Sequence, residues 1–75
     1  MNQHTYRIIL SPEPEGGFTV AVPALAGCIT YGDNLEHALM MAREAIELYI
    51  DVLKDQGEEV PDDSKTFEYS LVLAS

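Results

Sequence analysis

The sequence has too few thiols and metal ligands for the crosslinks that many small domains use. Its 75 residues include one cysteine and two histidines, so neither an internal disulfide nor a tetrahedral structural zinc site can form. A single core of this size supplies only about 3–5 kcal/mol, and small scaffolds usually need such crosslinks or self-association. Self-association is the option that remains. We therefore expect a homo-oligomer, either a dimer or a tetramer.

Positive charge is also scarce. Four Lys and Arg residues against thirteen Asp and Glu residues give a formal net charge of −9. Because nucleic-acid binding draws much of its affinity from Lys and Arg, which displace counterions from phosphates, we expect no direct binding to DNA or RNA. An acidic surface would instead attract a basic protein. Acidity that serves only solubility is the more common alternative.

Long apolar runs are absent. No stretch approaches the roughly 18 consecutive apolar residues of a membrane span, and the first residues lack the basic segment and apolar core of a leader. We therefore expect a cytoplasmic protein that makes no membrane contact. The length allows one domain, residues 1–75, and a hydrophobic content of 47% is typical of globular chains.

The pattern that is present predicts an α+β domain with the order β-β-β-α-β. Alternating apolar residues indicate strands in residues 5–10, 18–22 and 28–31. These three strands would form an antiparallel sheet, because the segment 11–17 carries turn-forming Pro and Gly residues and Pro23 ends the second strand. The run 66–73 alternates again. A right-handed crossover would place this fourth strand parallel to the first.

One long helix is predicted from Leu35 to a stop at Gln56-Gly57, with Asn34 or Asp33 as its N-cap. It would cover one face of the sheet with apolar residues at three-and-four spacing, namely Ala38, Leu39, Ala42, Ala45, Ile46, Tyr49 and Leu53. The flanking residues Met41, Leu48 and Val52 either widen this core face or contact a partner. Exposed sheet edges would also invite another chain.

Residues of catalytic type form no recognisable motif. No motif connects Cys28 to a histidine, and Glu68 is the one carboxylate on a predicted strand, whereas a hydrolytic metal site needs several. The pair Gly16-Gly17 joins two strands and lacks the following helix of a phosphate loop. We therefore expect no catalytic residue, no metal, no cofactor and no enzymatic activity. A residual nuclease that depends on Glu68 is a third alternative.

Several spaced motifs resemble the HicB family of antitoxins. They are Gly17-Phe18, Val22-Pro23, Leu25-Ala26-Gly27-Cys28, Gly32-Asp33, Leu35 with the helix alanines Ala38, Ala42 and Ala45, and Gly57 with Pro61. The resemblance covers residues 6–73 and implies a partial RNase H-like fold of non-catalytic type. It also implies a role, which is to bind and silence HicA, a small basic ribonuclease toxin that cleaves mRNA.

The resemblance further implies that the toxin is neutralised by occlusion of its RNA-binding face. We expect acids on the outer face of the helix and in the following loop to contact the basic toxin, namely Glu44, Glu47, Asp51, Glu58 and Glu59. For any one of them, a solvated surface charge is the more common explanation. The alternative function is a stand-alone oligomeric regulatory or structural module without a toxin. Many HicB proteins carry a C-terminal DNA-binding module, and because the sequence stops at Ser75 we expect no operator binding.

Overall fold

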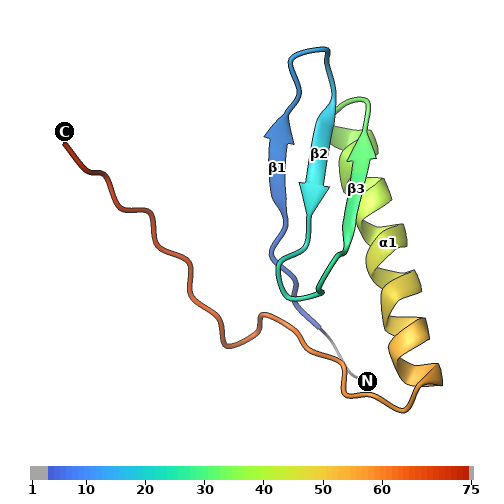
Figure 1. Ribbon diagram of the computed structural model, residues 1–75. Coiled ribbons are helices and arrows are strands. Elements are labelled where there is room, and N and C mark those ends of the chain that lie inside the picture. Colours follow the sequence, from blue (N-terminus) through green and yellow to red (C-terminus); the bar gives the residue numbers. More distant parts are fainter. Residues whose placement is uncertain (1–3, 75) are drawn as a thin grey trace.

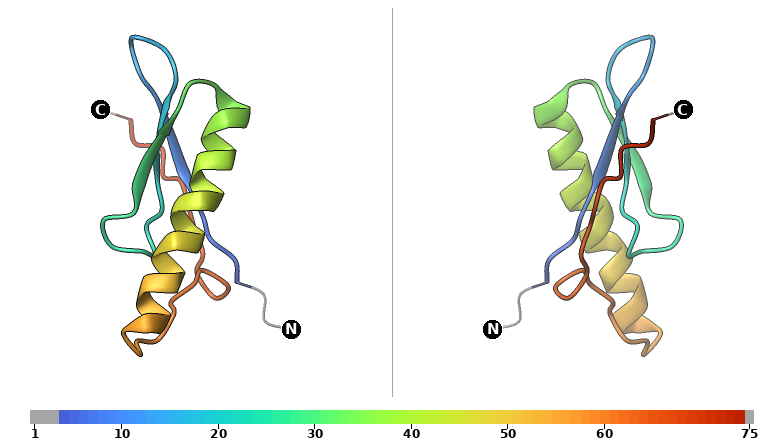
Figure 2. Two further views of the ribbon diagram at one scale, coloured as in Figure 1. Left: turned by 90° about the vertical axis from the view of Figure 1, so that its right-hand side faces the viewer. Right: turned by 90° about the vertical axis from the view of Figure 1, so that its left-hand side faces the viewer.

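The computed structural model describes residues 4–74 and has one sheet covered on one face by one long helix (Figure 1). The elements are β1 (Ile9–Pro12), β2 (Phe18–Ala21), β3 (Ile29–Gly32) and α1 (Leu35–Asp55). The strands are antiparallel in the order β1-β2-β3. Edge-on views show α1 on a single side of the sheet (Figure 2). The α+β class, the three-stranded antiparallel sheet and the single covering helix are thus confirmed.

The first strand begins later than predicted. It was expected over residues 5–10, whereas β1 pairs with β2 from Ile9, opposite Ala21, to Pro12, opposite Phe18. The reason lies in β2, which ends at Ala21 because Pro23 follows closely and has no N–H to donate. Residues 5–8 therefore extend past the end of the partner strand. The third strand is likewise shifted by one residue.

The core consists of two clusters on the helix side of the sheet. The first contains Val20, Ala38 and Ala42, with partly buried residues packed around them. The second contains Val22, Leu25 and Cys28 and is covered by Tyr6, Ile8 and the helix residues Ala45, Ile46, Tyr49 and Leu53. The helix packs mainly on β3 and less on β2. The inner face of β1 is consequently the least covered part of the sheet.

Both ends of α1 follow local capping chemistry. The Oδ1 atom of Asn34 accepts a hydrogen bond of 2.8 Å from the backbone N–H of His37, so Asn34 is the N-cap. At the other end the N–H of Glu58 donates to the carbonyl of Leu53 and the N–H of Gly57 to that of Lys54. With Gly57 at a φ of 70°, these two bonds form a Schellman motif. The predicted start and end of the helix are confirmed.

The predicted fourth strand is not formed. The structure assigns no strand to residues 66–73, and this segment runs away from the sheet with all of its residues exposed (Figure 1). A strand requires a neighbouring backbone that completes its hydrogen bonds, and the segment has no such neighbour among the described residues. The expected parallel pairing with β1 within the same chain is therefore wrong for this structure.

Candidate functional site

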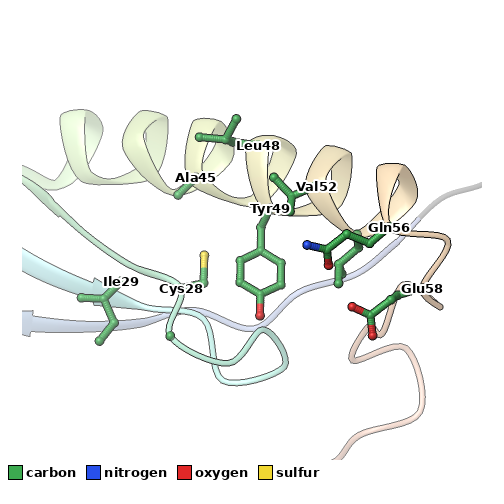
Figure 3. A pocket seen from close by; sticks show the side chains of 10 residues that line it. Cys28, Ile29, Ala45, Leu48, Tyr49, Val52, Gln56 and Glu58 are labelled. Atoms are coloured by element: carbon green, nitrogen blue, oxygen red, sulfur yellow. The ribbon is translucent and has the colours of Figure 1, made fainter.

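An apolar groove lies between the start of β3 and the C-terminal half of α1 (Figure 3). Its volume is about 480 Å³. It is lined by Gly27, Cys28 and Ile29 on the sheet side, by Ala45, Leu48, Tyr49, Val52, Leu53 and Gln56 on the helix side, and by Glu58 at the end of the helix. A groove with mostly apolar walls and a few polar groups is typical of a binding site.

A tyrosine of α1 bridges the two sides of the groove. The ring of Tyr49 extends from α1 towards the loop before β3, and its hydroxyl donates a hydrogen bond of 2.8 Å to the carbonyl of Ala26 (Figure 3). Leu25 of the same loop is fully buried in the second core cluster. The loop therefore cannot close the groove without losing both contacts.

The groove has apolar walls that the protein itself leaves uncovered. The exposed fractions are 68% for Leu48 and 47% for Val52. The interpretation of Leu48 and Val52 as part of a wide core face is therefore wrong, whereas Met41 is half-buried. Periodicity alone could not reveal this groove, because the exposure of a flanking residue depends on where the sheet lies beneath the helix.

The structure places all five predicted partner-binding acids at the surface. Glu44, Glu47 and Asp51 are exposed on α1, and the rotation of 100° per residue puts them within an arc of about 60°. On the same basis Leu48 lies about 40° from Glu44, so apolar and acidic side chains are adjacent. Glu58 lines the groove, and Glu59 follows it in the exposed loop. We call these five acids, together with the groove, the acidic groove surface.

Residues of catalytic type are not gathered at this surface. Cys28 is buried, and its burial raises the pKa of the thiol, which keeps it protonated and weakly nucleophilic at neutral pH. Glu68 lies in the exposed segment after the helix. Within residues 4–74, no group of three or more His, Cys, Asp or Glu side chains is arranged to hold a metal ion.

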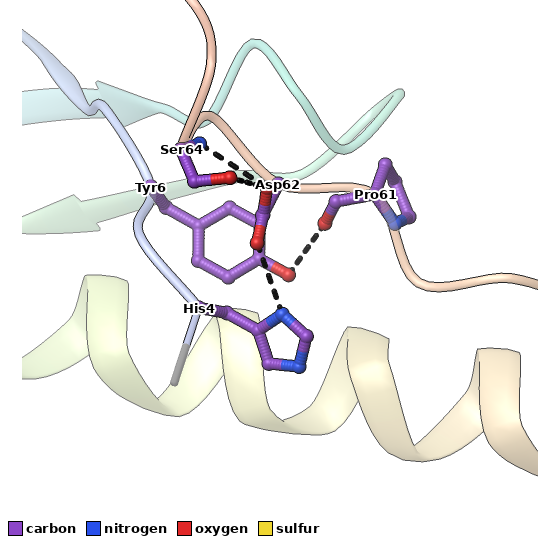
Figure 4. A network of polar contacts seen from close by, with 5 residues as sticks. All are labelled: His4, Tyr6, Pro61, Asp62 and Ser64. Atoms are coloured by element: carbon purple, nitrogen blue, oxygen red, sulfur yellow. Dashed lines mark hydrogen bonds and ion pairs between the residues drawn. The ribbon is translucent and has the colours of Figure 1, made fainter. Parts of the chain in front are cut away.

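A separate polar cluster fastens the chain after the helix to the residues before β1 (Figure 4). The Tyr6 hydroxyl donates a hydrogen bond of 2.6 Å to the carbonyl of Pro61, and Nδ1 of His4 lies 3.1 Å from Oδ2 of Asp62. Buried Asp63 accepts a bond of 2.8 Å from the N–H of Arg7. We call these contacts the terminal latch. They join segments more than 50 residues apart in the sequence.

The latch carboxylate Asp62 has a lowered pKa. The Ser64 hydroxyl and then the Ser64 backbone N–H donate to Asp62, and both bonds favour the charged carboxylate, as does the bond from His4. The pKa of Tyr6 is raised, first by partial burial and then by the negative charges of Asp62 and Asp63. Tyr6 therefore remains a hydrogen-bond donor at neutral pH.

We expect the latch to loosen in acid. Because the pKa of Asp62 is lowered by folding, its contribution is complete above the ordinary Asp value of about 3.9 and is lost as the pH falls through the lower value of the folded state. An NMR titration that follows the Ser64 amide should give a midpoint below about 3.9. The Ser64→Ala variant should raise the midpoint of Asp62. A midpoint at the ordinary value in both proteins would contradict this assignment.

Comparison with known proteins identifies the family of this chain. The family described as HicB-like antitoxin of bacterial toxin–antitoxin system matches residues 6–71. The chain belongs to the HicB-like antitoxin family. The match includes the three strands, α1 and every latch residue except His4, and the resemblance inferred from the spaced motifs is thereby confirmed.

Individual relatives agree with this assignment. The chain is 41% identical over 59 residues to a UPF0150 protein of Thermoplasma acidophilum, with 79% of this chain and 86% of that protein covered. It is 40% identical over 58 residues to a UPF0150 protein of Synechocystis, with 77% and 73% covered. It is also 34% identical over 56 residues to Antitoxin HicB 1 of Photorhabdus laumondii, where 75% of this chain but 36% of that protein is covered.

The HicB-like family consists of antitoxins of bacterial toxin–antitoxin systems, and an antitoxin acts together with a toxin. The described residues contain no helix with the length and apolar character needed to cross a lipid bilayer.

Proposed function

We propose that this HicB-like protein is a non-enzymatic cytoplasmic antitoxin that binds a small basic HicA-type mRNA interferase and neutralises it by covering its RNA-binding surface. The observation that carries the proposal is the acidic groove surface, where Glu44, Glu47 and Asp51 lie beside uncovered Leu48 and Val52. A ribonuclease presents positive charge to the RNA backbone. An acidic partner surface is complementary to that charge.

The two parts of the surface have different physical roles. The acids, together with a net charge of −9, would speed the encounter with a basic protein, an effect that weakens as salt is added. The uncovered apolar side chains along the groove would supply the contact area that holds the complex, since buried apolar anchors dominate interface energies. Occlusion by such a surface requires no chemical step of this chain.

A stand-alone oligomeric HicB-like module remains the second candidate. It is favoured by apolar surface on the outer sheet face, where the register aligns Ile9, Ala21 and Ile29 in one row, with Ile9 and Ile29 exposed by 48% and 65%. A second copy could cover this row. A neighbouring reading frame that encodes a basic protein of similar length supports the antitoxin, and its absence supports the stand-alone module.

The test is binding of that basic protein at low and high salt. The Glu47→Gln/Asp51→Asn variant removes two charges from the acidic groove surface, and we expect its affinity at low salt to fall about tenfold or more. The Glu13→Gln/Glu15→Gln variant loses the same charge from exposed positions at the β1–β2 turn, outside the acidic groove surface, and should bind nearly as well as the parent. Equal losses for the two variants, or no binding at either salt concentration, would refute the proposed surface.

A further inference from the structure

The segment 66–73, which we call the tail, exposes an unusual amount of apolar surface. The exposed fractions are 96% for Phe67, 85% for Tyr69, 78% for Leu71, 95% for Val72 and 86% for Leu73. Soluble monomers rarely leave apolar patches of this size in water. The tail also alternates between Phe67, Tyr69, Leu71 and Leu73 on one side and Glu68, Ser70 and Val72 on the other, as a half-buried strand does.

The tail starts beside the free edge of the sheet. Its first residue is fixed by a turn, in which the N–H of Thr66 donates to the carbonyl of Asp63 over 3.0 Å, and by the Arg7 guanidinium, which donates to the carbonyl of Thr66. Arg7 precedes β1, which is an edge strand in the order β1-β2-β3. From this point the tail leads away from its own β1 (Figure 1). The edge of β1 and the tail thus each lack a backbone partner among residues 4–74.

We propose that two copies of this chain exchange their tails, so that residues 66–73 of each copy pair as a parallel strand with the β1 edge of the other. An exchanged element occupies in its partner the place that it would occupy in a closed single chain. That place is the edge of β1, where the right-handed crossover rule puts a fourth strand. Residues 61–66 form the hinge of this exchange. Their latch contacts with the residues before β1 stay within their own chain.

The faces of the two segments are complementary. Leu10 lies on the helix side of β1 and is only partly buried, because α1 packs on β3 and β2. A paired tail would turn Phe67, Tyr69, Leu71 and Leu73 towards this uncovered inner face and Glu68, Ser70 and Val72 outwards. The edge strand Ile9–Pro12 has no charged residue, and the tail has a single charge at Glu68. The exchange therefore avoids most of the repulsion between two chains of net charge −9.

The area is close to that of a stable dimer. An aromatic side chain buries about 150–250 Å², so the four rings of two tails alone would remove roughly 600–1,000 Å² from water. With Leu71 and Leu73 of each tail and the covered β1 edges, the total approaches the roughly 1,200–2,000 Å² of stable interfaces.

The first test is the mass of the full-length protein by light scattering. We expect at least twice the chain mass of 8.3 kDa, and a monomer for Leu71→Glu. The Ser70→Glu variant adds the same charge to the outward side of the tail and should keep the parent mass. Because Leu71 and Ser70 are both exposed within the single chain, neither variant should lose its circular dichroism signal. A monomeric parent, or a Leu71→Glu variant with unchanged mass, would overturn the proposal.

The second test locates the contact. In an equal mixture of ¹³C-labelled and unlabelled chains, nuclear Overhauser effects between copies should join the Leu71 methyl groups to Leu10. Contacts of Leu71 with Leu10 of its own chain alone would show that the tail closes within one copy. Contacts between copies that join the tail to Leu48 or Val52 would place it in the groove instead. Either result would overturn the exchange on β1.

Discussion

Replacement of Gly32 by alanine should remove most of the folding free energy. Gly32 is the buried last residue of β3, and a Cβ there would lie 2.7 Å from the Cβ of Ala38 and closer still to the Ala38 backbone. Helix backbone cannot rotate out of the way as a side chain can. Overpacking costs about 1–3 kcal/mol and occasionally more, against about 3–5 kcal/mol for a core of this size. We expect a loss of about 3 kcal/mol in urea unfolding.

The control for Gly32 is Gly27, which has a φ of 76° and open space where a Cβ would be placed. Its replacement by alanine should cost only the backbone strain of a positive φ, about 1 kcal/mol. If Gly27→Ala destabilises the protein as much as Gly32→Ala, the close approach of α1 to the end of β3 is not what limits the size of residue 32.

The Leu25→Ala and Leu48→Ala variants should separate folding from binding. Leu25 is 1% exposed in the second core cluster, and its truncation should cost about 2–5 kcal/mol. Leu48 is 68% exposed on the groove, so its truncation should change stability by less than about 0.5 kcal/mol. The same Leu48 variant should weaken binding to the basic partner, because it removes an apolar anchor.

Urea unfolding and titration calorimetry measure these two effects independently. A Leu48→Ala variant that is destabilised like Leu25→Ala would mean that Leu48 belongs to the core. If the Leu48→Ala variant is stable and binds as tightly as the parent, the apolar groove is not part of the interface. Binding would then depend on the acidic residues only.

The helix could be predicted from the sequence because its limits depend on nearby residues. Asn34 reaches the N–H of His37 three positions away, and Gly57 adopts the positive φ of a Schellman motif. Such chemistry is independent of the rest of the fold. The start of β1, by contrast, depends on where β2 ends ten or more residues later, and the alternation of residues 5–10 carries no information about that partner.

The same distinction applies to the candidate site. Helical phase was sufficient to place Glu44, Glu47 and Asp51 on one face. It was not sufficient to find the groove, which depends on how α1 lies over β3 and on the bridge from Tyr49 to Ala26. The alternation of the tail likewise indicated a strand but could not specify which backbone completes its hydrogen bonds. Pairing partners are properties of tertiary and quaternary structure.

In the proposed function, the acidic groove surface is the means by which this HicB-like protein silences a toxin. The most direct test is RNA cleavage by a basic HicA-type ribonuclease, measured with increasing amounts of this chain. We predict that cleavage stops near equimolar addition, and that Glu47→Gln/Asp51→Asn requires about tenfold more protein at low salt. Undiminished cleavage in a large excess of the folded parent protein would contradict the proposed function.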